Sequence, residues 1–174
     1  MNSILKTALA SLCVVGTISA FAENLLPSSD FTAESGWGIW VNKPVLDAGG
    51  SGKLEDGTVV VNSPVYDKQG PYNIQIIGKL DIPAGKTYTL KLKIKSDKDG
   101  SLPVNYGLQG APYTAYAGTK IDVQAGEKEY TCTLNVKKDK DGNYDAPRAI
   151  RIVPGGFQDA NLTFSNISLE EVKE

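Results

Sequence analysis

A strict alternation of apolar and polar residues from Thr87 to Lys95, TYTLKLKIK, most limits what this chain can fold into. Successive side chains of a β-strand point to opposite faces, so Tyr88, Leu90 and Ile94 share one face and the lysines share the other. Such a segment forms a strand with one buried and one hydrated face, which is typical of an antiparallel sheet. Because helical periodicity is nearly absent after residue 22, we expect a chain built from strands.

Short alternating runs recur along the chain, and Gly, Pro, Asp and Asn residues separate them. Besides 87–95, the pattern predicts strands at 38–42, 58–62, 73–79, 104–109, 120–123, 129–137, 149–153 and 161–171. Many short strands at this spacing predict an all-β fold, a β-sandwich of two antiparallel sheets. No repeat or linker divides residues 23–174, so they are expected to form a single domain.

The first residues, MNSILKTALASLCVVGTISAFA, have the pattern of a bacterial-type secretory signal peptide. Lys6 precedes an apolar run, and the Ala-Phe-Ala sequence at 20–22 provides a small-x-small cleavage site. The run is too short and too interrupted to span a bilayer. Leu12 precedes Cys13, whereas a lipoprotein signal has a small residue just before its cysteine. We therefore expect residues 1–22 to be removed and the unlipidated product to be secreted, whether extracellular, on the cell surface or in the periplasm.

The composition excludes several classes of function. The chain has no histidine, which excludes Ser-His-Asp and Cys-His nucleophiles and any histidine metal site. A glycosidase would need two carboxylates that flank the scissile bond. Most acidic residues here lie in turns such as SDKDG, where they are solvated and are not expected to act as catalytic acids. The net charge of −2 and the lack of a basic stripe argue against nucleic acid. We expect no enzyme, no nucleic-acid partner and no membrane insertion.

Two further features have ordinary structural interpretations. Cys132 alternates in phase with Leu134 and Val136, which predicts a small buried residue rather than a reactive thiol. The segment KKDKDGNYD, residues 137–145, resembles a calcium loop in its oxygen-bearing side chains. Its glycine is displaced from the required position and no glutamate follows at the usual spacing, so we interpret it as a polar hairpin turn.

Both tryptophans lie in one short stretch, SGWGIWVN, and residues three apart cannot share one face of a flat strand. One of Trp37 and Trp40 should therefore pack inward, while the other faces out as a flat platform for a ligand. The segment NYGLQGAPYTAY adds Asn105, Gln109 and Tyr113. Aromatic rings contact the C–H faces of sugars, and amides hydrogen-bond their hydroxyls. The pattern therefore favours a glycan-binding site.

Five segments, in order, resemble the family-4 carbohydrate-binding modules, also called the CBM 4/9 or CenC-like group: NLLPSSDF, GWGIW, AGKTYTLKLKIKS, QGAPY and VPGGFQDANLTFSNISLEEV. The resemblance covers nearly all of residues 23–174. It implies a jelly-roll β-sandwich of the galactose-binding-domain-like type, with a cleft across one sheet that holds a single glycan chain. Members of this family typically bind soluble β-glucan, amorphous cellulose or xylan, and they are not catalytic.

The resemblance also implies roles for individual residues. In relatives, the tryptophan of the GW motif packs inside the fold, and an aromatic residue three positions later lines the cleft. Trp37 would then be structural and Trp40 would be the stacking platform. The aromatic residue of the APY motif corresponds to Tyr113, and the preceding amide position corresponds to Gln109. Two rings from different parts of the chain would hold one sugar chain from opposite sides.

Strand parity extends the candidate site to Asn105, Arg151 and Gln75. Asn105 shares a face with Gln109. Arg151 alternates with isoleucines and is expected to face outward, where the alternative is an ordinary solvated charge. Burying the amide of Gln75 without partners would cost roughly 1–3 kcal/mol, which favours the hydrated side. The family alignment instead puts the isoleucines that flank Gln75 on the cleft floor.

Several positions depart from the family pattern. Polar positions of the last cleft strand correspond to Ala149 and Val153, an amide position corresponds to Gly78, and a position that can be basic is Pro103. Ser165 stands where relatives often have an aspartate, which leaves the family's structural calcium open. The resemblance therefore does not carry over specificity, and we expect no cofactor to be required.

The sequence thus predicts a secreted, non-catalytic protein that holds a β-linked glycan such as β-glucan, amorphous cellulose or xylan in an open cleft. Aromatic stacking and amide hydrogen bonds would hold the chain. The alternative is a structural or protein-interaction β-sandwich of the cell surface with a non-functional cleft. The expected partner is a polysaccharide, with a glycoside hydrolase or a cell-surface assembly as the protein partner.

Overall fold

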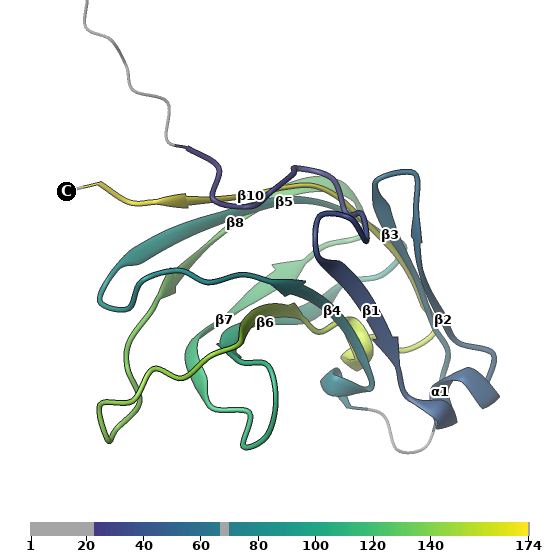
Figure 1. The fold of residues 1–174 in the computed structure, drawn as a ribbon. Coiled ribbons are helices and arrows are strands. Elements are labelled where there is room, and N and C mark those ends of the chain that lie inside the picture. The colour runs from purple at the N-terminus through teal and green to yellow at the C-terminus, as the bar shows by residue number, and fades with distance from the viewer. Residues whose placement is uncertain (1–22, 67–69, 174) are drawn as a thin grey trace, which may run out of the picture.

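Two antiparallel five-stranded sheets face each other in the computed structural model, which describes residues 23–66 and 70–173 (Figure 1). Sheet A contains, in spatial order, β1 (Trp37–Val41), β4 (Ile74–Lys79), β9 (Arg148–Ile152), β6 (Gly100–Leu108) and β7 (Ala115–Val123). Sheet B contains β2 (Ser51–Glu55), β3 (Thr58–Ser63), β10 (Ala160–Glu171), β5 (Thr87–Ser96) and β8 (Gly126–Asn135). The all-β sandwich predicted from the sequence is confirmed. The signal peptide predicted at 1–22 lies outside the described residues.

Strand β5 shows why the alternating pattern was informative. Tyr88, Leu90 and Ile94 are fully buried, whereas the lysines between them are exposed or half-buried on the outer face of sheet B. Strand β2 was not predicted because its sequence, SGKLE, contains one large apolar residue and no alternation. Strands β6 and β7 begin earlier than the patterns at 104 and 120 indicated, and the Pro103 peptide lies inside β6.

Short helices occupy connections at the edge of the sandwich. They are α1 (Lys43–Asp47) and the 3₁₀ turns η1 (Pro71–Asn73) and η2 (Pro154–Gly156), each with a proline in its first turn. Proline suits this position because its missing N–H would have no partner there. No helix in the described part of the chain is long and apolar enough to cross a membrane.

The core lies between the two sheets and is lined by alternate residues of each strand. Ile76 and Ile150 come from sheet A, and Leu90 and Phe164 come from sheet B, all with no exposed surface. Cys132 is buried on the inner side of β8, as predicted, and burial raises the pKa of its thiol to about 11. The residues of sheet A that alternate with this core point to its other face.

The segment 136–147 is a polar turn, but the prediction of a hairpin was wrong because it connects β8 of sheet B to β9 of sheet A. The carboxylate of Asp139 accepts hydrogen bonds from the backbone N–H groups of Asp141 (2.9 Å) and Asn143 (2.7 Å). The hydrogen bonds from Asn143 hold the pKa of Asp139 below its usual value. The oxygen-bearing side chain thus caps its own turn.

Candidate functional site

The outer face of sheet A contains an open cleft of about 740 Å³. This volume lies in the range of sites that bind small organic ligands. All six residues that the sequence predicted for the site line this one cleft: Trp40, Gln75, Asn105, Gln109, Tyr113 and Arg151. They come from β1, β4, β6, β9 and the loop after β6. The structure therefore brings the predicted residues together, and their role in binding stays a prediction.

Strand β1 separates the two tryptophans as its parity predicted. Trp37 is 4% exposed and packs against Phe31 with ring centroids 4.7 Å apart. Its ring also covers Gly78, its partner on β4, where an added Cβ would lie 2.6 Å from a ring carbon. Trp40 is 46% exposed and lines the cleft beside Gln75, its own partner on β4. Trp37 is therefore a core residue, as predicted, and Trp40 is available to a ligand.

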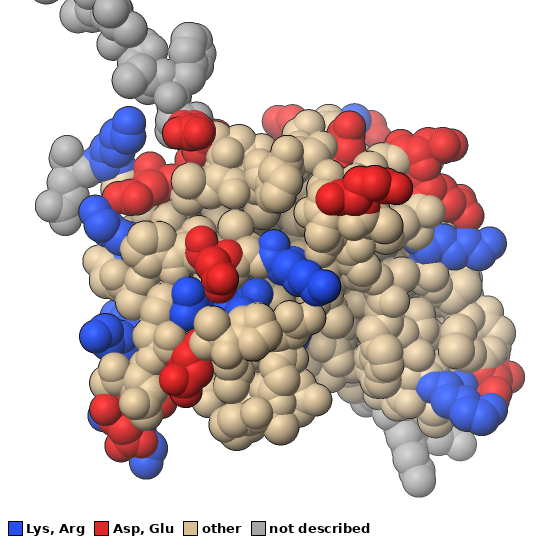
Figure 2. Space-filling model, viewed as in Figure 1, with Lys and Arg blue, Asp and Glu red and all other residues tan. Residues whose placement is uncertain are grey.

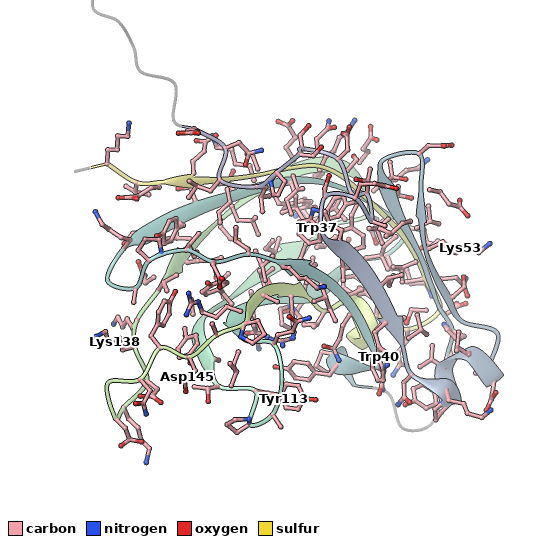
Figure 3. All side chains as sticks on the ribbon, viewed as in Figure 1. Trp37, Trp40, Lys53, Tyr113, Lys138 and Asp145 are labelled. Carbon is pink, nitrogen blue, oxygen red and sulfur yellow. The ribbon has the colours of Figure 1, made fainter. Side chains whose placement is uncertain are left out.

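Tyr113 stands on the other side of the cleft, on the loop that joins β6 to β7. In Figure 3, Trp40 and Tyr113 are both labelled along the lower side of the sandwich. The ring of Tyr113 is 66% exposed, and its backbone has a φ of 57°. Its N–H donates to the carbonyl of Gly110 (2.8 Å), which closes a turn. A side chain at Gly107 would meet the carbonyl oxygen of Thr114 at 2.3 Å, so the glycine permits this close loop.

A third exposed ring, Tyr72, was missed by the sequence analysis. Tyr72 lies in η1, is 55% exposed and lines the same cleft. It belongs to no alternating strand, so period-two reasoning could not place it. A usable signal existed nonetheless, since Tyr72 follows Pro71 in a loop just as Tyr113 follows Pro112.

Amide side chains connect the cleft to Tyr72. Gln75 Nε2 donates to the Tyr72 carbonyl (2.9 Å), and Asn105 Nδ2 donates to the Tyr72 hydroxyl (3.2 Å). Each amide retains a carbonyl oxygen for which no hydrogen bond to the described residues is found. The pair can therefore accept hydrogen bonds from hydroxyl groups of a ligand while Tyr72 is held in place.

Arg151 differs from the prediction, because it is buried rather than exposed on the surface. Only 8% of the residue is accessible, and Ala149 and Val153 on the same side of β9 have no exposed surface. Strand β9 lies in the middle of sheet A between β4 and β6. Arg151 Nη2 donates to the carbonyls of Leu108 (2.8 Å) and Gln109 (2.9 Å). The guanidinium thus lies in the cleft floor under the Tyr113 loop.

Two assignments transferred from the family alignment also differ from the structure, because the residues concerned face the core. Ile74 and Ile76 are fully buried in the core, so they do not form the cleft floor, whereas Gln75 lines the cleft. Gly78 shares their side of β4 and lies against Trp37. An alignment offset by one residue reverses the faces of a strand, which explains both errors.

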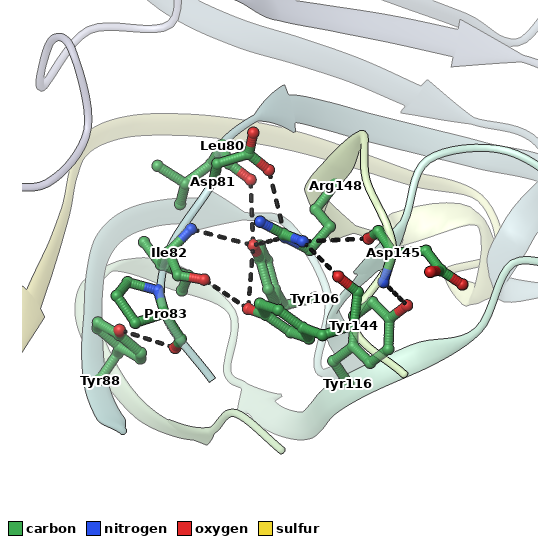
Figure 4. A network of polar contacts seen from close by, with 10 residues as sticks. All are labelled: Leu80, Asp81, Ile82, Pro83, Tyr88, Tyr106, Tyr116, Tyr144, Asp145 and Arg148. Carbon is green, nitrogen blue, oxygen red and sulfur yellow. Dashed lines mark hydrogen bonds and ion pairs between the residues drawn. The ribbon is translucent and has the colours of Figure 1, made fainter. Parts of the chain in front are cut away.

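A second polar network supports the end of the cleft from behind (Figure 4). Arg148 Nε donates to the Tyr106 hydroxyl (3.1 Å) and lies 3.2 Å from an Asp81 carboxylate oxygen, and its guanidinium stacks 4.0 Å from the Tyr144 ring centroid. Burial raises the pKa of Tyr144, so its phenol stays protonated. The network fixes the segment before β9, where the Pro147 carbonyl accepts the Gln109 N–H (2.8 Å).

The cleft has a distinctive charge. None of its lining residues is acidic, and Arg151 is the one ionised side chain among them. Figure 2 shows acidic and basic side chains over the upper part and along the lower left and lower right edges of the face in view, while its lower centre carries neither. Across the described residues, no three His, Cys, Asp or Glu side chains cluster in a way that could hold a metal. The chemistry available in the cleft is stacking, hydrogen bonding and one positive charge.

No protein-family model matches the sequence, and no curated protein matches it significantly. Solved structures do match the fold. A family-4 carbohydrate-binding module, CBM4, is 20% identical, and the match covers 78% of this chain and 86% of that chain with a TM-score of 0.59. The N-terminal cellulose-binding domain of β-1,4-glucanase C from Cellulomonas fimi is 21% identical, with coverages of 84% and 95% and a TM-score of 0.58.

The second N-terminal cellulose-binding domain of the same Cellulomonas fimi glucanase is 19% identical. It covers 88% of this chain and 97% of its own length, with a TM-score of 0.57. At these identities the likeness establishes the fold. The jelly-roll β-sandwich and the resemblance to family-4 modules that the sequence indicated are therefore confirmed at the level of the fold.

Proposed function

We propose that this protein is a secreted, non-catalytic carbohydrate-binding protein that holds a single β-linked glycan chain in the cleft of sheet A. The observation that carries the proposal is the convergence of three exposed rings, Trp40, Tyr72 and Tyr113, on one open cleft with amide side chains between them. Exposed apolar side chains that gather in one patch, rather than lying singly, often mark a binding site on a soluble protein. Their flat faces complement the C–H faces of pyranose rings.

The polar side chains support the same ligand class. Gln75 and Asn105 line the cleft between the aromatic residues, and the carbonyl oxygens of their amides can accept hydrogen bonds from sugar hydroxyls. β-Glucan, amorphous cellulose and xylan are the chains we propose, in keeping with the cellulose-binding domains that share the fold. A glycoside hydrolase or a surface assembly acting on that polysaccharide is the proposed protein partner.

Binding without catalysis agrees with the chemistry of the cleft. Hydrolysis of a glycosidic bond needs a pair of carboxyl groups beside it, and no Asp or Glu lines the cleft. We also propose that no cofactor is needed, so that a chelator leaves binding unchanged. The alternative, a structural sandwich with a non-functional cleft, predicts that no glycan binds.

Affinity gels containing β-glucan, hydroxyethyl cellulose or xylan test the proposal. We expect retarded migration in at least one gel, and a change in tryptophan fluorescence on titration with the matching oligosaccharide, since Trp40 is exposed. A Trp40→Phe variant keeps a ring but removes the cleft indole, so it should bind while the fluorescence change disappears. Unretarded migration in every gel, with no fluorescence change, would support the structural alternative.

A further inference from the structure

The two arginines of this chain, both on β9, have different electrostatic partners. Arg148 lies 3.2 Å from a carboxylate oxygen of Asp81. The hydrogen bonds of Arg151 go to the backbone instead, because its Nη2 donates to the carbonyls of Leu108 and Gln109. Within residues 23–66 and 70–173, no hydrogen bond from its Nε or Nη1 is found and no carboxylate forms an ion pair with it. Among these residues, Arg151 therefore has N–H donors that are not hydrogen-bonded and a positive charge that no carboxylate compensates.

Arg151 is also more than nine-tenths buried in the floor of the cleft. Removing a charge from water is costly unless an opposite charge or enough hydrogen bonds compensate for it. Burial lowers the pKa of Arg151, but an arginine side chain stays protonated in a protein. None of the cleft residues is acidic, so an anionic group on a ligand would supply a counter-charge that the cleft itself lacks.

We infer that Arg151 forms an anion subsite in the cleft, which selects glycan chains that carry a carboxylate or a sulfate ester. This inference rests on the proposed function and specifies its substrate class. The Nε–H and Nη1–H groups of Arg151 are left to donate to the oxygens of such a group, and charge-assisted hydrogen bonds are roughly twice as strong as neutral ones. A neutral chain would leave the buried charge uncompensated.

The position of Arg151 relative to Tyr113 makes the subsite accessible to a stacked sugar. The guanidinium carbon lies 5.9 Å from the Tyr113 ring centroid, and Asn105 is the direct partner of Arg151 on β6. A sugar on the Tyr113 platform would therefore hold its acidic substituent next to the guanidinium, with the Asn105 amide beside it. Uronic acids carry their carboxylate at the end of an exocyclic carbon, which suits this side-on approach.

Four oligosaccharides of one length and linkage test the inference by calorimetric titration of the wild-type protein. They are cellohexaose, the corresponding β-1,4-linked glucuronate hexamer, the methyl ester of that hexamer and 6-O-sulfated cellohexaose. We expect the uronate or the sulfated chain to bind at least roughly tenfold more tightly than cellohexaose. A hydrogen bond to a charged group stabilises a complex enough to lower its dissociation constant by about this factor. The methyl ester should lose this advantage, because it has the same shape without the charge.

Two variants assign the effect to its residue. Arg151→Gln should bind cellohexaose and the acidic chains alike, whereas Lys53→Gln removes the same charge from the exposed edge strand β2 and should keep the preference. If Arg151→Gln does not fold, the comparison of uronate with methyl ester on the wild-type protein still decides. Preference for the uronate would show that Arg151 recognises a carboxylate, and preference for the sulfated chain would show that it recognises a sulfate ester.

The outcomes separate this inference from the proposed function. Equal affinity for cellohexaose, the uronate, its ester and the sulfated chain, or an acidic preference that survives in Arg151→Gln, would overturn the anion subsite and leave glycan binding intact. Binding of cellohexaose alone would do the same. Absence of binding to all of the chains, together with unretarded migration in every affinity gel, would overturn the proposed function and this inference with it.

Discussion

The two faces of sheet A use the same strands for opposite purposes. The inner face carries Trp37, Ile76 and Ile150, which pack into the core with little or no exposed surface. The outer face carries Trp40 and Arg151, which line an open cleft. On β1 the two environments lie three residues apart. The comparison teaches that residue type alone does not reveal function here: strand parity decides whether a tryptophan stabilises the fold or is available to a ligand.

The largest expected effect is on the inner face. Trp37→Ala should lower the free energy of unfolding by roughly 3–5 kcal/mol, because it leaves a cavity between Phe31 and Gly78. Urea denaturation followed by circular dichroism would measure this loss. The variant protein that remains folded at low temperature should still migrate slowly in a glycan gel. A loss below about 1 kcal/mol would mean that Trp37 does not belong to the core.

The equivalent change on the outer face should affect binding instead. Trp40→Ala should weaken glycan affinity roughly 30-fold or more, because an aromatic residue at the centre of an interface often contributes 2 kcal/mol or more. Its unfolding free energy should stay within about 1 kcal/mol of the wild type, since nearly half of the residue is exposed. Titration calorimetry and urea denaturation on one preparation would check both values. Unchanged affinity for a glycan that the wild type binds would remove Trp40 from the site.

Tyr113 sharpens the comparison because its backbone is strained and its ring is exposed. Its φ of 57° lies in the left-handed region, which costs a residue with a side chain roughly 1–2 kcal/mol and costs glycine little. Tyr113→Ala and Tyr113→Gly should both weaken glycan binding, because both remove the ring. The glycine variant should be the more stable of the two by about 1 kcal/mol in thermal denaturation. Equal stability would show that the turn relaxes when the ring is absent.

Much of this arrangement could be predicted because period-two alternation is a local property. The strand at 87–95, the opposite orientations of Trp37 and Trp40 and the burial of Cys132 all follow from parity within one segment. The position of Tyr113 came from the resemblance of its APY motif to a known family. These predictions needed no knowledge of which strands are neighbours.

Prediction from the sequence failed for residues whose burial or position depends on which strands and loops lie next to them in the fold. The burial of Arg151 depends on β9 lying between β4 and β6 and on the loop that covers it, and neither is encoded in the alternation of five residues. Tyr72 belongs to a 3₁₀ turn, which has no period-two pattern. Its place in the cleft results from the tertiary fold, since Asn105, from a distant strand, contacts its hydroxyl.

The outer face of sheet B is a third surface that can be compared with the two faces of sheet A. It is also built from alternate strand residues, but several of its charges are paired with one another. Lys91 lies 3.1 Å from Glu170 on the neighbouring strand, and Lys93 lies 3.0 Å from Glu127. These lysines therefore have carboxylate partners on neighbouring strands, whereas the one charged side chain that lines the cleft is left without a carboxylate.

The smallest expected effect tests this difference. Glu170→Gln breaks the pair with Lys91 but should lower the unfolding free energy by no more than about 1 kcal/mol, because half of the Lys91 side chain is exposed to water. The loss should shrink further at high salt, which screens exposed charges. Glycan affinity should not change, since neither residue lines the cleft. Urea denaturation at low and high salt, together with titration of the glycan, would measure these effects. A change in affinity as large as that of Trp40→Ala would show that the two outer faces are coupled, and the functional contrast between them would then be wrong.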